Sequence, residues 1–235
     1  MPNILAHAYI TDQVFPNTPT DLLIGSTLPD FLGMHRDYQK EIVNRRNLVV
    51  SGVMMAGIDF HYRTDSAFDS LSIRRSLLGM AREDLLTTIP HLGRGATRAC
   101  ADIGTDILLD GVMLEEGDFV EVYDRLKCAV LHDEHSLSAA GSISLAESVT
   151  KYFASSVSNN YCDPGIVAKI LQDRFERRRG TWIEFSKSDV PYVTDVFDRQ
   201  RARIRLVAHQ LLGLTVTKLQ GGPDVLANGN ILSSE

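Results

Sequence analysis

A histidine and an aspartate at helical spacing form the first pattern in this sequence that could do chemistry. His61 and Asp65 are four residues apart, in a stretch over 48–65 whose first eleven residues carry no charge. We expect a helix there that is buried on all sides. Residues at i and i+4 share one helix face, so the imidazole and the carboxylate can reach the same ion or substrate atom. The alternative is that the carboxylate only holds the histidine at a helix end.

Three further carboxylates share one stripe of a second apolar segment. Asp102, Asp106 and Asp110 are its only charged residues. Ionised carboxylates taken out of water are costly, so they must be protonated, paired with arginine or lysine, or bound to a metal. We expect Asp102 and Asp106 to bind one metal ion together with His61 and Asp65. Asp110 lies about 12 Å from Asp102 along the helix axis, too far to join that ion.

Two more candidate ligands lie near the N-terminus. His7 follows three apolar residues, and it can be either a ligand or a core histidine. Asp30 follows Pro29, which we expect to end or kink a helix that begins near Thr20. At that junction the Asp30 carboxylate can serve as a helix cap or as a ligand.

The elements that must position these side chains are helices, because apolar residues recur at helical spacing and no series of alternating strands is found. We expect helices over 48–65, 99–113, 117–137, 142–157, 163–179 and 189–212. Asp163 and Pro164 are suited to the N-cap and the first turn of one of them. Arg74 and Arg75 are expected at the surface. The sequence therefore predicts an all-α fold, with a single compact multi-helix domain over residues 1–219 and a loosely ordered tail over 220–235.

Composition narrows the class of protein. With 235 residues, 44% of them hydrophobic and 23% charged, the chain is typical of a soluble globular protein. The net charge of -6 argues against nucleic acid as the main partner. Three cysteines without C-x-x-C spacing predict neither a disulfide framework nor a thiolate zinc site. The sequence has no basic N-terminal region and no apolar run of membrane-spanning length, so we expect a cytoplasmic protein.

Four motifs in the N-terminal half carry a family resemblance. The chain contains, in this order, Asn3-x-Leu5-Ala6-His7, Gly25-x-x-Leu28-x-Asp30-Phe31, Gly57-Ile58-x-x-His61-x-Arg63-x-Asp65-x-x-x-Asp69 and Asp102-x-x-x-Asp106. Over residues 3–125 it resembles the acyl carrier protein phosphodiesterases, which are related to the all-helical HD-type metal-dependent phosphohydrolases. It departs from the family pattern at Tyr62 and Ile107, where the family tends to have arginine and histidine.

The resemblance implies an HD-phosphohydrolase-like fold and cleavage of the phosphodiester that joins 4'-phosphopantetheine to a serine of acyl carrier protein. Such a site needs cations near the phosphate and an activated water, because the negative oxygens repel a nucleophile. The implied metal ligands are His7, Asp30, His61, Asp65, Asp102 and Asp106. Mixed imidazole and carboxylate ligands suit Mn, Fe or Zn, and Mg is possible. Arg63, which could contact a substrate phosphate, and Asp69 are the candidate catalytic residues.

Two alternatives remain open. His7 and the Gly25-x-x-x-Pro29-Asp30 element also resemble the zinc-dependent phospholipase C group. This resemblance implies the same metal-dependent phosphodiester cleavage with a different substrate. In the other alternative the chain is a non-catalytic helical binding protein whose aspartate stripe is neutralised by arginine. The arginines over 174–179 and 199–205 are either solvated helix faces or a basic rim that docks an acidic carrier protein.

Overall fold

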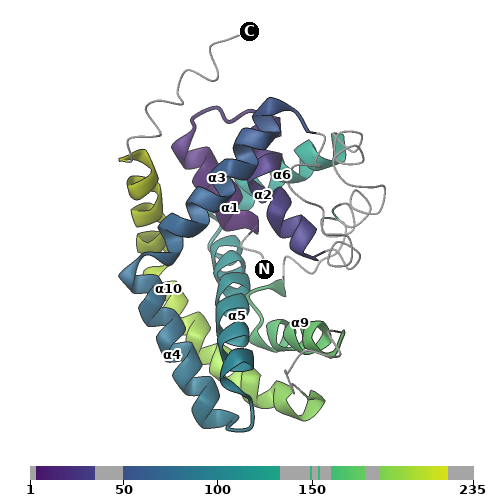
Figure 1. Cartoon of the computed structure of the whole chain (residues 1–235), viewed down its shortest axis with the longest axis vertical. Helices are drawn as coiled ribbons and strands as arrows, with labels where there is room; N and C mark the ends of the chain where they lie inside the picture. Colours follow the sequence, from purple (N-terminus) through teal and green to yellow (C-terminus); the bar gives the residue numbers. More distant parts are fainter. Residues whose placement is uncertain are drawn as a thin grey trace.

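The computed structural model of the chain describes residues 4–34, 50–132, 149, 153, 160–177 and 186–221. These residues contain eight α-helices, one short 3-10 helix and no strand, which confirms the all-α class (Figure 1). The elements are α1 (Ile4–Val14), α2 (Thr20–Met34), α3 (Gly52–Asp69), α4 (Ser72–Thr88), α5 (Arg94–Glu115), α6 (Val120–His132), α9 (Pro164–Arg177), η3 (Lys187–Asp189) and α10 (Val190–Gln220). In this part of the chain, none of the helices has both the length and the apolar character needed to cross a membrane.

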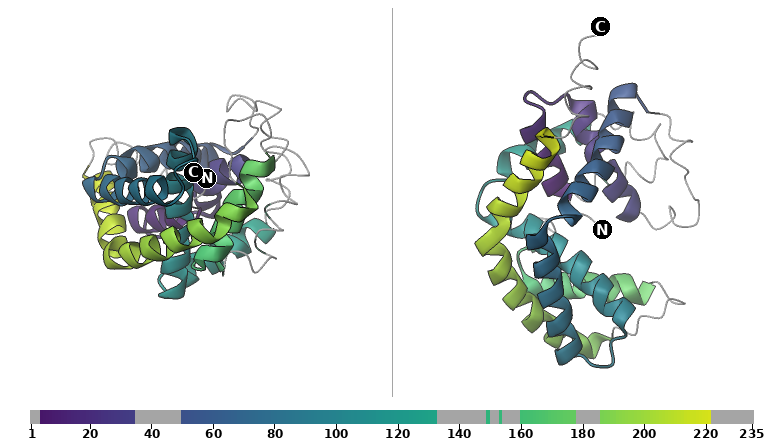
Figure 2. Two further views of the ribbon diagram at one scale, coloured as in Figure 1. Left: turned by 90° about the horizontal axis from the view of Figure 1, so that it is seen from below. Right: turned by 60° about the vertical axis from the view of Figure 1, so that its left-hand side comes forward.

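The helices form two groups joined by the longest one. Helices α1, α2, α3 and α6 gather at one end of the molecule, and α4, α9 and most of α5 lie at the other (Figure 1). The 31-residue helix α10 runs along the side of both groups and contacts α1, α3, α4, α5 and α9 (Figure 2). One apolar core extends through both groups, with Phe31, Phe119 and Phe197 among its fully buried side chains.

Helices α2 and α3 approach each other closely because two glycines face each other. A Cβ atom on Gly25 would lie 2.2 Å from the carbonyl oxygen of Met54, and one on Gly57 would lie 2.5 Å from that of Leu22. Any side chain at either position would therefore push the helices apart. This contact lies one turn before His61 and brings that histidine to the backbone of α2.

Helix α3 differs from the expected helix that is buried on all sides. Met54 and Ile58 are buried, but Gly52, Tyr62 and Ser66 are exposed, so only one side of α3 faces the core. Ser51 caps the helix, because its hydroxyl accepts a hydrogen bond from the Met54 amide at 3.1 Å.

Pro29 does not end its helix, since α2 continues to Met34. The proline ring leaves the carbonyl of Gly25 without its helical donor. Asp30 therefore lies within α2, rather than at a helix junction as expected.

The second half of the chain follows the predicted pattern more closely. Helix α9 begins at Pro164, and the carboxylate of Asp163 accepts hydrogen bonds from the amides of Gly165 and Ile166 at 2.8 and 3.2 Å. This N-cap was predicted. Helix α10 continues past the predicted end at residue 212 to Gln220. Only positions 149 and 153 are described of the helix expected over 142–157. The tail from residue 222 lies outside the described residues.

Candidate metal centre

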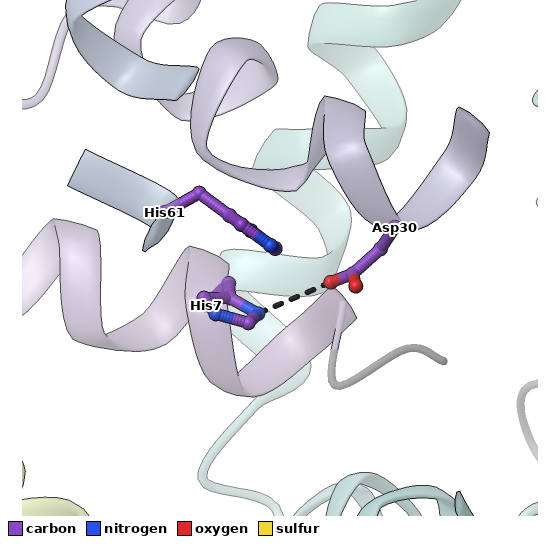
Figure 3. A group of neighbouring side chains, drawn as sticks. All are labelled: His7, Asp30 and His61. Atoms are coloured by element: carbon purple, nitrogen blue, oxygen red, sulfur yellow. Dashed lines mark hydrogen bonds and ion pairs between the residues drawn. The ribbon is translucent and has the colours of Figure 1, made fainter. Parts of the chain in front are cut away.

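Helices α1, α2 and α3 bring four of the predicted ligands together. Nδ1 of His7 lies 3.1 Å from the carboxylate of Asp30, and Nε2 of His7 lies 3.1 Å from that of Asp65. The second oxygen of Asp65 lies 3.3 Å from Nε2 of His61. Figure 3 shows how His7, Asp30 and His61 point toward one another from three different helices. Ligand atoms of these three residues all lie within 4.8 Å of one another.

The two imidazoles are buried and stacked. The His7 and His61 rings have centroids 4.0 Å apart and an interplanar angle of 26°. Both residues are less than 5% exposed, whereas the side chain of Asp65 is 51% exposed. The group is therefore closed on the side of the histidines and open to solvent at Asp65.

Each histidine is oriented through its Nδ1 atom. Nδ1 of His61 lies 2.8 Å from the backbone carbonyl oxygen of Ser26. A carbonyl oxygen only accepts hydrogen bonds, so this nitrogen carries the proton and the Nε2 atom can offer a lone pair. In His7, the Asp30 carboxylate takes the position that the Ser26 carbonyl takes for His61. Both Nε2 atoms therefore point to the Asp65 carboxylate.

Charge is strongly coupled within this group. Burial lowers the pKa of His7, but the carboxylates of Asp30 and Asp65 raise it by a larger amount. The net result is a pKa of about 10. Burial raises the pKa of Asp65, and hydrogen bonds from His61 and His7 outweigh it and hold that pKa well below its usual range. In the metal-free protein, the proton on His7 thus balances carboxylate charge. A divalent cation would do the same between the atoms that face one another.

The donor set fits a divalent transition metal. Metal-bound histidines usually donate their second ring N–H to a carboxylate or a backbone carbonyl, which fixes the ring and the tautomer. Asp30 and the Ser26 carbonyl lie in these two places. Two imidazole nitrogens and a carboxylate are ligands that suit Zn, Mn or Fe.

Asp102 and Asp106 are not part of this group, in contrast to the shared site expected from the sequence. Asp102 pairs with Arg82 at 2.6 Å and with Arg98 at 3.7 Å. Asp106 accepts two hydrogen bonds from Arg74. Burial raises the pKa of Asp106, and the Arg74 guanidinium opposes this shift. A carboxylate in an apolar setting can be protonated, paired with arginine or lysine, or bound to a metal. At Asp102 and Asp106 the partner is arginine rather than the expected metal ion.

The third aspartate of the stripe has a different partner. Asp110 is fully buried, and its two oxygens accept the backbone N–H groups of Leu5 and Ala6, each at 3.0 Å. Burial raises the pKa of Asp110 well above its usual range, although these hydrogen bonds oppose the shift. Asp110 thus contacts the helix that carries His7, and no sequence pattern indicates this contact.

The two candidate catalytic residues lie on α3 beside the group. Arg63 is half-buried, between His61 and Asp65 in the chain, and it forms no ion pair with any residue that the structure describes. Asp69 is mostly exposed and accepts a hydrogen bond from Nε of Arg74 at 2.6 Å. The expectation that Arg74 is a surface residue is wrong, because this side chain is buried between Asp69 and Asp106.

A second group of possible ligands lies at the C-terminal end of α5. Nε2 of His209 on α10 lies 3.3 Å from the Glu116 carboxylate and 3.6 Å from that of Asp118. All three residues are exposed. Water can satisfy such groups, and they lack the buried, oriented imidazoles of the first group.

Of the arginines proposed as a docking rim, the four over 199–205 are engaged within the molecule. Arg199 and Arg203 pair with Asp84 on α4, and Arg201 and Arg205 pair with Glu115 on α5. Hydrogen bonds from Arg201 and Arg205 lower the pKa of Glu115. The arginines at 178 and 179 lie outside the described residues.

Comparison of the chain with protein-family models, with curated proteins and with solved structures finds no match.

Proposed function

We propose that the chain is a metal-dependent phosphodiesterase whose divalent ion is held by His7, His61 and Asp65, with Asp30 orienting the His7 ring. One observation carries the proposal: two buried, stacked imidazoles are each oriented at Nδ1 and both direct Nε2 to one half-exposed carboxylate. This arrangement places two nitrogen ligands of fixed ring orientation beside an oxygen ligand that solvent can reach.

The chemistry of phosphodiester cleavage fits this donor set. When bound, the ion would offset charge on the phosphate oxygens and lower the pKa of a water molecule. The protein would orient the two rings through Asp30 and the Ser26 carbonyl, and it would leave the approach from the Asp65 side open. Arg63, which has no ion-pair partner among the described residues, would contact a second phosphate oxygen.

Acyl carrier protein is the substrate that the four sequence motifs favour. The proposed reaction transfers the phosphoryl group of the serine-linked 4'-phosphopantetheine to water, which breaks the ester bond to serine. A zinc phospholipase C-like or nucleotide-directed phosphohydrolase is the alternative within the same chemistry. The arginine pairs of Asp102 and Asp106 favour a second candidate, a non-catalytic helical binding protein, because they neutralise the stripe without a metal.

Elemental analysis of the purified full chain tests the metal. We expect about one Zn, Mn or Fe ion per chain in the wild type, loss of this ion in Asp65→Asn, and its retention in the matched control Asp102→Asn. The shared site expected from the sequence predicts loss in both variants. A wild type with no stoichiometric transition metal, and no uptake on addition of Zn or Mn, contradicts the proposal and supports the binding protein.

Activity is tested with two substrates. We expect the metal-loaded wild type to hydrolyse bis(p-nitrophenyl) phosphate and to release 4'-phosphopantetheine from holo-acyl carrier protein, whereas Asp65→Asn does neither. Cleavage of the small diester alone, without salt-sensitive binding of the carrier protein, supports the general phosphohydrolase instead. A metal-loaded chain that cleaves neither substrate contradicts the proposed activity but not the metal site.

A further inference from the structure

The first turn of α1 is a buried helix end that needs hydrogen-bond acceptors. The first N–H groups of any α-helix have no partner within the helix. In α1 these groups belong to residues that are fully buried, namely Ile4, Leu5 and Ala6. Water cannot reach them, and an unpaired buried N–H group is destabilising. His7 follows directly in the chain.

Asp110 supplies the acceptors from a residue far along the chain. Its carboxylate receives the N–H of Leu5 on Oδ2 and the N–H of Ala6 on Oδ1, each at 3.0 Å, across more than one hundred residues of sequence. Both oxygens of Asp110 therefore accept, and they lie at the N-terminal, positive end of the α1 helix dipole. Asp110 forms no ion pair with any described residue, unlike Asp102 and Asp106 on the same stripe.

Two hydrogen bonds to consecutive amides stabilise a helix end and also determine its position. A single capping hydroxyl constrains one N–H, whereas a carboxylate that binds two neighbouring N–H groups fixes the axial position and the rotation of the first turn. A shift of that turn would move the His7 ring relative to Asp30 and Asp65, which contact its two nitrogens on opposite sides.

We infer that Asp110 is the positioning residue of the candidate metal centre, and that it sets the place of His7 by anchoring the N-terminus of α1 to α5. One test of this inference, the measurement of Zn binding, rests on the proposed function. A second readout, the nitrogen NMR signals of the two histidine rings in the metal-free chain, does not depend on it. Asp110 touches neither ion nor substrate.

The test compares the same substitution at two positions of α5. Asp110→Asn keeps the shape of the side chain but places an NH2 group against one backbone N–H. Asp106→Asn makes the same change one turn earlier, where the partner is Arg74 rather than α1. We expect Asp110→Asn to shift the His7 ring signals and to weaken Zn binding by about tenfold or more, as the loss of a residue that orients a metal ligand typically does. Asp106→Asn should change neither property by more than about twofold.

Each outcome separates the inference from the proposed function. Unchanged His7 signals in a folded Asp110→Asn chain overturn the inference, as does an equal effect of Asp106→Asn. If the wild type binds no metal, the proposed function fails, and the NMR comparison still decides the role of Asp110. If Asp110→Asn does not fold, Asp110→Glu, which keeps both oxygens but is longer by one methylene, is measured in the same way. Wild-type His7 signals in Asp110→Glu then overturn the inference.

Discussion

Arg74 binds Asp106 across the interface of α4 and α5 through two guanidinium hydrogen bonds. Its third contact, from Nε, reaches Asp69 at 2.6 Å, and its guanidinium lies 4.5 Å from the centroid of the Phe68 ring. The side chain is only 7% exposed. One arginine thus neutralises a mostly buried carboxylate and ties α3, α4 and α5 together, in place of the metal ion expected at Asp106.

The substitution Arg74→Met tests this role. Removal of the guanidinium leaves Asp106 buried and unpaired, so we expect the free energy of unfolding to fall by about 3–5 kcal/mol. The double variant Arg74→Met with Asp106→Asn should recover much of this loss, because no buried charge is then left unpaired. Urea unfolding followed by circular dichroism measures both effects. A loss below about 1 kcal/mol in the single variant would show that water already compensates Asp106.

The contact between α2 and α3 predicts a large effect from one methyl group. In Gly57→Ala the new Cβ would lie 2.5 Å from the Leu22 carbonyl oxygen. The helices must separate, which weakens the hydrogen bond from His61 to the Ser26 carbonyl. We expect a loss of about 1–3 kcal/mol in unfolding free energy and a loss of metal binding.

Gly79→Ala is the matched control for Gly57→Ala. Gly79 also lies inside a helix, but nothing lies within 4 Å of a Cβ added there. Alanine should raise the unfolding free energy by about 0.4–1 kcal/mol and leave metal binding unchanged. Equal behaviour of the two variants in urea titrations would mean that the close approach of α2 and α3 has no part in holding His61.

The local features of the fold could be predicted from the sequence. Helical periodicity indicated the all-α class, and the N-cap at Asp163 followed from residue type alone. Arg74 could not be placed, because an Arg74-Arg75 pair is typical of a surface and only the tertiary fold brings it to Asp106. The continuation of α2 beyond Pro29 was not predicted either, because proline usually ends or kinks a helix.

The candidate site could be predicted only in part, for a similar reason. His61 and Asp65 are four residues apart on one helix, so the spacing predicted that their side chains lie close together. The motifs indicated His7 and Asp30. The aspartate stripe was ambiguous, because arginine and metal both neutralise buried carboxylates and the sequence does not say which is near. Only the fold shows that Asp102 faces Arg82 on α4, twenty residues away in the chain.

A buried hydroxyl beside the site provides a further prediction. Thr64 is 2% exposed, and its Oγ1 atom has no hydrogen-bond partner in the described structure. Thr64→Val keeps the shape and removes the unsatisfied group, so we expect the unfolding free energy to rise by about 1 kcal/mol. The control is Thr11→Val, which removes the bond from the Thr11 hydroxyl to the His7 carbonyl at 2.7 Å and should lower it by about 1 kcal/mol. Destabilisation by both variants in thermal or urea unfolding would show that Thr64 binds an ordered water.

The start of α10 predicts how stability depends on pH. Burial raises the pKa of Asp189, but hydrogen bonds from the backbone and side chain of Ser186 and from His91 outweigh it, so the pKa is lowered below the ordinary value of 3.8. A carboxyl group with a lowered pKa in the folded state stabilises the protein above its unfolded pKa, and this stability is lost as the pH falls through the folded pKa. Asp189→Asn should therefore reduce the unfolding free energy most above the unfolded pKa of Asp189, and the two chains should converge as the pH falls through its folded pKa. Urea unfolding at a series of pH values measures the difference, and curves that stay parallel over this range would show that Asp189 does not titrate with folding.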